Sequence, residues 1–153
     1  MVLEQSVGYQ LKRVQHALRV QMDNALRETG LTTPQYAALS AIEETPGLSG
    51  NKIARQCFVT PQTMNLILAN LEEMELIVRR PHPEFGRMLQ AYLTPAGEKR
   101  LQESHYKVNQ IEETMVADFT DDQRLMLAQE LHRCADALEG SRDKARTSLP
   151  ERT

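Results

Sequence analysis

The segment from Leu48 to Gly97 most constrains the fold, because helix-start and turn signals divide it into short elements in a fixed order. The predicted elements are a helix over Ser49–Cys57, a bend at Phe58-Val59, a helix that begins at Thr60-Pro61, a strand over Leu76–Arg80, a loop over Pro81–Met88, a strand over Leu89–Leu93 and a helix that begins at Thr94-Pro95. Threonine accepts a hydrogen bond at a helix N-terminus, and proline suits the first turn, where its missing N–H costs nothing. Helix, turn, helix and hairpin in this order predict a winged helix-turn-helix.

Two helices are predicted before this segment. Apolar residues three or four positions apart between residues 5 and 28 form a stripe down one long helix, which Gly30 ends. A second helix is expected to begin at Thr33-Pro34, with Thr33 as its cap, and to end near Glu44.

Two more helices are predicted after the hairpin. The first is expected over residues 95–118. The second follows a capping box in which Thr120 and Gln123 bond reciprocally, and it should run to Leu138 and end at Gly140.

The expected fold class is therefore all-α with a small β-hairpin wing. The winged helix-turn-helix occupies residues 33–97, residues 1–32 and 98–140 form dimerisation helices, and residues 141–153 form a flexible tail. The long helices carry more apolar surface than the small central segment can cover, so pairing with a second copy is the economical way to bury it. Burial within a helical monomer is the alternative.

The distribution of charge favours nucleic-acid binding more than the total does. The net charge is −3, whereas nucleic-acid-binding proteins are usually basic. Between Leu76 and Arg100, however, there are five basic residues and two acidic ones, Glu84 and Glu98. A basic hairpin on an otherwise acidic protein can still bind phosphate on one face, although an ordinary solvated surface would also fit.

Composition points to the cytoplasm and away from catalysis. No apolar run approaches the roughly 20 residues of a membrane helix, and the N-terminus lacks an export signal. Cys57 and Cys134 give no disulfide framework and are expected to be buried small hydrophobic residues, with thiol sensing as the less favoured alternative. The four histidines do not have zinc-ligand spacing. His105 and Glu112 could meet on one helix, but a single pair of this kind usually lies on the surface. No nucleophile or phosphate-loop motif occurs. We therefore expect no metal, no cofactor and no enzymatic activity.

The helix that begins at Pro61 is the candidate recognition helix. Its core side is expected to contain Met64, Ile67, Leu68, Leu71 and Met74. Its outward, N-terminal residues would contact bases in the major groove, where Asn and Gln bond adenine and an aliphatic side chain touches the thymine methyl. Arg87 near the hairpin tip would enter the minor groove, and other basic residues would contact phosphate. The candidate DNA-contacting residues are Lys52, Arg55, Thr60, Gln62, Thr63, Asn65, Leu66, Asn70, Arg79, Arg80 and Arg87. Outside a helix-turn-helix, solvated polar residues and idle surface charge would be the preferred explanation, whereas inside one DNA contact is preferred.

The same segment resembles a known family. The residues from Leu71 to Arg79, the prolines at 81 and 83, Gly86-Arg87 and the run from Leu93 to Gly97 are similar to the signature of the MarR (multiple antibiotic resistance regulator) family. This resemblance implies a homodimer on a pseudo-palindromic DNA operator, usually repressing, and often released by small phenolic or anionic compounds or by oxidants.

This chain departs from the family pattern in three places. Glu75 replaces the usual glycine after the recognition helix, and a left-handed conformation there would cost energy. Phe85 replaces the usual Asp two residues before the wing arginine, so that pairing is absent. Leu66, Ala69 and Asn70 replace basic residues on the outward helix face, which removes phosphate contacts. A protein–protein adapter that has lost DNA affinity is the competing interpretation.

A small aromatic or anionic effector is expected to bind where the first two helices, the fifth helix and the central segment meet. A lining of apolar and cationic side chains suits an aromatic acid. The candidates are Tyr9, His16, Arg19, Met22 and Tyr36. No motif marks this pocket, and the same residues could simply pack helices together.

Overall fold

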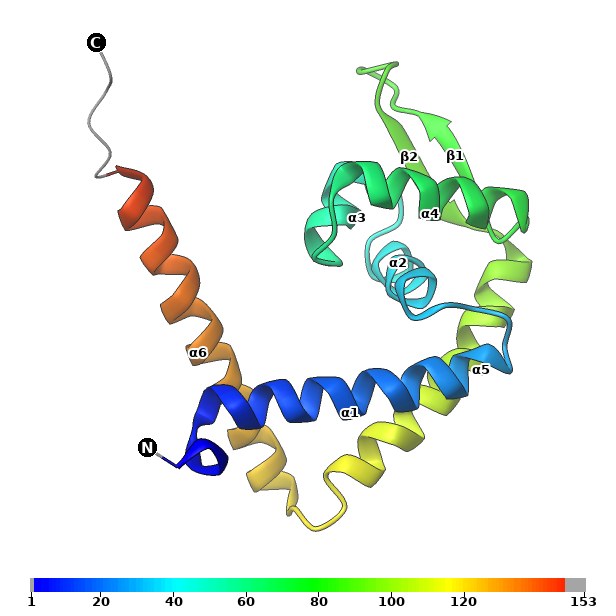
Figure 1. Ribbon diagram of the computed structural model, residues 1–153. Helices are drawn as coiled ribbons and strands as arrows, with labels where there is room; N and C mark the ends of the chain where they lie inside the picture. The colour runs from blue at the N-terminus through cyan, green and yellow to red at the C-terminus, as the bar shows by residue number, and fades with distance from the viewer. Residues whose placement is uncertain (1, 148–153) are drawn as a thin grey trace. The chain divides into compact units, whose positions relative to one another are not determined.

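The computed structural model describes the backbone of residues 2–147 and the side chains of residues 2–141. The chain divides after Glu112 into two compact units. The first unit contains η1 (Leu3–Gln5), α1 (Val7–Arg27), α2 (Thr33–Glu44), α3 (Gly50–Gln56), α4 (Pro61–Glu73), β1 (Ile77–Pro81), β2 (Leu89–Leu93) and most of α5 (Pro95–Met115), and the second contains α6 (Asp121–Thr147) (Figure 1). The order helix, turn, helix, hairpin confirms the predicted winged helix-turn-helix.

Side-chain caps fix where the helices of the first unit begin. Ser49 accepts from the backbone N–H of Lys52 at the start of α3, and Thr60 accepts from that of Thr63 at the start of α4. The predicted cap of α2 was one residue too late. Thr32 is the cap, because only Thr32 has a glutamine three positions later, Gln35, whose side chain bonds back to the cap N–H.

Left-handed residues end three helices. At Gly30, Phe58 and Glu75 the φ angles are 73°, 58° and 59°, and each residue follows the last turn of a helix. After α4, Glu75 N–H bonds the carbonyl of Glu72 at 2.9 Å and Leu76 N–H bonds that of Leu71 at 3.0 Å, a Schellman motif. The strain expected if Glu75 were left-handed is therefore present, and Phe58 has the same conformation at the predicted bend.

One hydrophobic core joins α2, α3, α4 and the hairpin. Its fully buried large residues include Leu39, Ile42, Ile53, Met64, Leu68, Leu71, Leu76, Ile77 and Leu101. Strands β1 and β2 pair antiparallel from Ile77 opposite Leu93 to Pro81 opposite Leu89. Met74 was predicted on the core side of α4, but it lies at the helix end and is 38% exposed. These contacts hold α4 and the hairpin, called the wing below, on one scaffold.

Gly97, in the first turn of α5, makes the closest backbone approach of this unit. A Cβ atom built on it would lie 2.0 Å from the carbonyl oxygen of Leu76. Thr94 secures the same corner, because its hydroxyl donates to the carbonyl of Glu75 at 2.7 Å and accepts from Gly97 N–H at 3.0 Å. The start of α5 is thereby fixed against the turn between α4 and β1, at Glu75 and Leu76.

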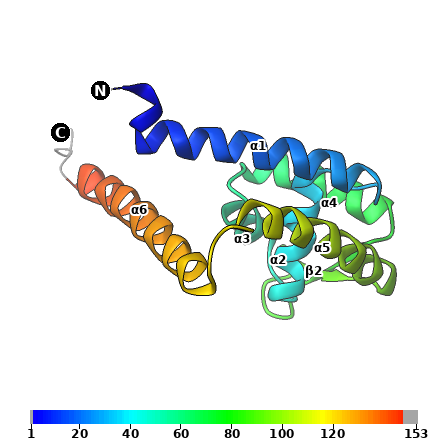
Figure 2. The ribbon, with the colours of Figure 1, turned by 90° about the horizontal axis from the view of Figure 1, so that it is seen from below.

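Helix α1 is buried at only one end of its apolar stripe. Leu26 is fully buried, whereas Val7, Leu11 and Val14 are exposed. In Figure 2 the N-terminal part of α1 extends beyond the winged helix-turn-helix. The stripe is consequently available to another surface.

Helix α6 dominates the second unit and is longer than predicted. The capping box of Thr120 and Gln123 is confirmed by bonds of 2.9 and 3.2 Å. Gly140 does not end α6, which continues to Thr147, so residues 141–147 of the predicted tail are helical and residues 148–153 lie outside the described chain. A single glycine inside a helix costs only about 1 kcal/mol, which its helix-favouring neighbours offset. Helix α5 also ends at Met115, three residues before the predicted end.

Candidate nucleic-acid interface

The N-terminal half of α4 presents polar side chains to solvent. Gln62, Thr63 and Asn65 are exposed, and Leu66 is 70% exposed although it is aliphatic. Thr60 has a structural task as the helix cap, and its hydroxyl also donates to that of Thr63 at 2.9 Å. The predicted division of this helix into a core side and an outward side is confirmed for these residues. Side chains of this kind can bond adenine edges and touch thymine methyl groups in a major groove.

A groove of about 630 Å³ separates α3 and α4 from the wing. It is lined by Ser49, Gly50, Asn51, Asn65, Arg79, Phe85, Arg87, Met88, Leu89 and Ala91. The groove therefore brings Asn65 of the recognition helix and Arg87 of the wing, which are far apart in sequence, to the same hollow. A DNA strand running between a major and a minor groove would have to pass here if both elements bind the duplex.

The basic candidates differ in whether other side chains already engage their charge. Arg79 donates from Nε to Glu72 Oε1 at 2.6 Å, which ties β1 to the end of α4 and neutralises much of its charge. The guanidinium of Arg80 lies 5.5 Å from the ring centroid of Tyr92. Lys52, Arg55 and Arg87 are exposed, and none of them joins an ion pair among the described side chains. A contact with DNA consequently suits these three better than Arg79.

The tip of the wing has its own fixed structure. His82 Nδ1 accepts from the backbone N–H groups of Glu84 and Phe85 at 3.1 and 3.2 Å, and the His82 and Phe85 rings lie 5.2 Å apart. The loss of an Asp–Arg pair therefore does not leave the turn without side-chain support. This role of His82 was not predicted, although a histidine before a Pro-containing turn is a usable signal for such a bond.

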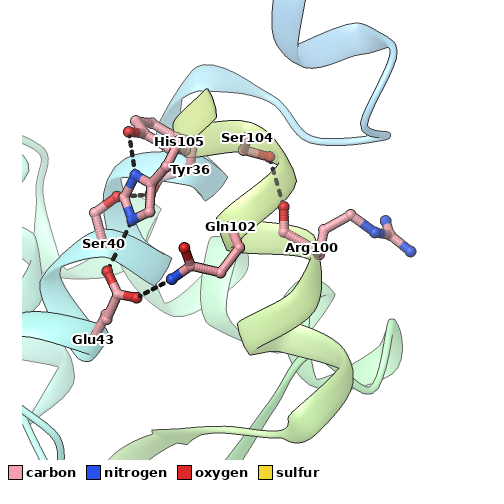
Figure 3. A network of polar contacts seen from close by, with 7 residues as sticks. All are labelled: Tyr36, Ser40, Glu43, Arg100, Gln102, Ser104 and His105. Carbon is pink, nitrogen blue, oxygen red and sulfur yellow. Dashed lines mark hydrogen bonds and ion pairs between the residues drawn. The ribbon is translucent and has the colours of Figure 1, made fainter. Parts of the chain in front are cut away.

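Tyr36, a predicted effector residue, belongs to a polar network between α2 and α5 (Figure 3). Its hydroxyl lies 2.8 Å from His105 Nδ1, while His105 Nε2 lies 2.8 Å from Glu43 Oε2. Gln102 donates to the other oxygen of Glu43 at 3.0 Å. Burial, with a smaller contribution from the negative charge of Glu43, raises the pKa of Tyr36. His105 therefore pairs with Glu43, distant in sequence, and not with Glu112, which it could have met on its own helix.

The other predicted effector residues do not join this network. Tyr9, His16 and Arg19 are exposed on α1, and Met22 is partly buried. A second cleft, of about 380 Å³, lies beside the network and is lined by Ile42, Glu43, Pro46, Tyr92, Leu93, Glu98 and Gln102. None of the five predicted effector residues lines either of these two clefts, so the effector site stays a prediction.

The two cysteines have different surroundings. Cys57 is partly buried against the core, and that burial raises the pKa of its thiol. Phe58, the next residue in the sequence, is 91% exposed. Cys134 is exposed on α6, which corrects the expectation that it is buried within the chain.

The described residues contain neither a candidate membrane helix nor a candidate metal site. None of the helices drawn there is both long enough and apolar enough to cross a membrane. No three histidine, cysteine or acidic side chains among them could hold a metal ion.

Comparisons with known proteins match the chain to one group. A model of the MarR family matches residues 29–88. The HTH-type transcriptional repressor Rv2887 of Mycobacterium tuberculosis is 41% identical over 91 residues. That alignment covers 60% of this chain and 66% of the repressor, just under two thirds of its length.

Solved structures extend the similarity along the chain. The crystal structure of the Mycobacterium tuberculosis MarR family protein Rv2887 with salicylic acid has a TM-score of 0.68 and 32% identity, and covers 84% of this chain and 96% of the solved one. The structure of the same protein with DNA has a TM-score of 0.69 and 30% identity, and covers 84% and 97%. The similarity thus includes the helices on both sides of the winged segment.

Proposed function

Because this chain belongs to the MarR family of transcriptional regulators, we propose that it is a ligand-responsive repressor that binds a pseudo-palindromic DNA operator as a homodimer. The observation that carries this proposal is the groove that joins Asn65 of α4 to Arg87 of the wing. Residues 33–97 would contact DNA, with Gln62, Thr63 and Leu66 beside Asn65 at the bases. The protein would act in the cytoplasm and catalyse no reaction.

The exposed stripes of the long helices support a homodimer. Leu127, Leu131 and Leu138 of α6 are exposed, as are the apolar residues at the start of α1. Apolar stripes of this length are usually buried against another surface. Residues 1–32 and 98–140 would supply that surface in a second copy, and would set the two recognition helices about 34 Å apart to match one turn of DNA.

An aromatic acid is the proposed effector. The relative Rv2887 has been solved with salicylic acid. In this chain, Tyr9, His16, Arg19, Met22 and Tyr36 would surround such a ligand, with Arg19 supplying the positive charge. The bond of Tyr36 to His105 offers a connection from this site to both α2 and α5. A ligand that alters the spacing of the two recognition helices would shift the population away from the DNA-binding arrangement.

Selection of duplexes from a random DNA pool tests the proposal. The protein should enrich a short palindrome and bind it with an affinity that falls as salt rises. Arg87→Ala should weaken binding and lower the salt slope by about 2 per dimer, since one contact is lost on each wing. Arg133→Ala, which removes an exposed arginine paired within α6, serves as the control once sedimentation has shown that its dimer is intact.

A protein–protein adapter would behave differently in the same assay. It would enrich no sequence, and its weak DNA binding would not respond to Arg87→Ala. The absence of any enriched sequence, with a dimer intact by sedimentation, would refute the repressor, whereas unchanged binding of a selected duplex by Arg87→Ala would remove only the wing from the mechanism. Effector binding is tested on the selected duplex with salicylate, which should release the protein.

A further inference from the structure

The tip of the wing exposes an aromatic ring next to its arginine. Phe85 is 61% exposed and lies two residues before Arg87. A single exposed hydrophobic residue needs no explanation by itself. Phe85 differs from such residues because the structure holds it in place and directs it to the groove beside the recognition helix.

Several bonds fix the backbone around Phe85. The ring Nδ1 of His82 accepts from the backbone N–H groups of Glu84 and Phe85, and the backbone N–H of His82 donates to the Met88 carbonyl at 2.7 Å. Met88 N–H in turn bonds the Phe85 carbonyl at 2.8 Å. To accept both bonds, His82 Nδ1 must be unprotonated. The turn therefore presents Phe85 in a defined position, with its ring centroid 5.2 Å from that of the imidazole and the two ring planes tilted by 43°.

The position of the ring is that of a DNA contact. Phe85 lines the same groove as Asn65 and Arg87. If α4 occupies a major groove and the wing reaches the neighbouring minor groove, the sugar-phosphate strand between them lies in this hollow, and its deoxyribose rings form the minor-groove wall. Proteins that enter minor grooves often add apolar side chains to their basic ones.

We propose that Phe85 is an additional DNA-contacting residue, whose ring packs on the deoxyribose wall of the minor groove beside Arg87, and that His82 is its positioning residue. This inference rests on the proposed function and deepens it. A carboxylate at residue 85 would engage the guanidinium of Arg87, whereas phenylalanine leaves that group free for the duplex. Part of the wing's contribution to the binding free energy would then come from an uncharged contact.

Single-tryptophan fluorescence gives a direct test, because the chain has no tryptophan. The probe is the tightest duplex recovered from the random pool. In Phe85→Trp, adding this duplex should quench the emission and protect the indole from acrylamide. In the control Phe119→Trp, in the connection between α5 and α6, neither signal should change. An indole at residue 85 that stays equally accessible to acrylamide with bound DNA would overturn the proposal.

Affinity and its salt dependence separate the ring from the arginine. Phe85→Ala should weaken binding about tenfold or more, a loss typical of apolar and stacking contacts to nucleic acid, with the salt slope unchanged. Arg87→Ala should weaken binding and reduce the slope. Phe85→Leu, which stays apolar, should recover part of the affinity. Full affinity in Phe85→Ala beside a weakened Arg87→Ala would refute the role of the ring and leave the repressor intact, whereas a wild-type chain that binds no duplex would refute the repressor itself.

The role of His82 is tested through Phe85. His82→Ala should weaken binding, and adding it to Phe85→Ala should cause little further loss, because both act on one contact. His82→Asn should recover part of the affinity, since the amide oxygen of Asn can accept backbone N–H groups in a turn. Additive losses in the double variant would remove His82 from the mechanism.

Discussion

Replacing Gly97 by alanine tests the contact between α5 and the end of α4. Alanine is the better helix former, by about 1 kcal/mol, so sequence reasoning alone predicts a stabilising change. The structure predicts the opposite. The new Cβ would lie 2.0 Å from the Leu76 carbonyl oxygen and 2.9 Å from its carbon, and both are backbone atoms that cannot rotate away.

The magnitude follows from the displacement required. Real Cβ atoms essentially never approach another heavy atom closer than 3.0 Å, so α5 would have to move by an ångström or so away from Leu76. Overpacking of this kind costs typically 1–3 kcal/mol, and a backbone contact belongs at the upper end. After the gain in helix propensity, Gly97→Ala should lower the free energy of unfolding by about 2 kcal/mol.

Gly140→Ala is the matched control. It makes the same substitution inside a helix, but a Cβ there meets nothing within 4 Å. It should raise stability by about 0.5–1 kcal/mol. Urea unfolding followed by circular dichroism, at one protein concentration because a dimer's stability depends on it, measures both variants. A Gly97→Ala protein as stable as the wild type would show that the contact with Leu76 does not constrain this corner.

Three further predictions concern single residues. Glu75→Gly should raise the free energy of unfolding by about 0.5–1 kcal/mol, because glycine relieves the left-handed strain but adds entropy to the unfolded chain; unchanged or lower stability in urea would contradict this. Burial raises the pKa of Cys57, so its thiolate is scarce at neutral pH. In a Cys134→Ser background, Cys57 should therefore react with Ellman's reagent more slowly than N-acetylcysteine does, and its rate should increase as pH rises. An equal rate at neutral pH would argue against that burial. Ser104 is fully buried, and its hydroxyl donates to the Arg100 carbonyl at 2.8 Å and lies 3.0 Å from Thr29 Oγ1, so Ser104→Ala should cost about 1 kcal/mol; a thermal unfolding midpoint no lower than that of the wild type would contradict this.

Local signals in the sequence were sufficient to predict the order of elements. Caps, prolines and turns act within a few residues, so the starts of α3 and α4 and the bend at Phe58 were predicted correctly. The errors were also local. The capping box of Thr32 and Gln35 was present in the sequence, but the adjacent Thr33-Pro34 was preferred as the helix start. Gly140 was predicted to end α6, although glycine ends a helix in this way only where its backbone is left-handed.

Contacts between distant residues account for what sequence reasoning missed in the candidate site. Periodicity correctly separated the exposed Asn65 and Leu66 from the buried side of α4. It could not show that Glu72 would bind Arg79, or that Glu43 would reach His105 across helices α2 and α5. Those pairs depend on how α4 lies against β1 and how α2 lies against α5, which no spacing within one helix encodes.

Two non-glycine residues with positive φ, Phe58 and Glu75, bracket the helix that carries the proposed base-contacting side chains. Each could become glycine with a gain in stability, so this part of the chain retains an unused reserve. Such a reserve matters for evolution. A descendant that makes either exchange could tolerate costly substitutions on the outward face of α4, and so acquire a new operator preference without losing its fold.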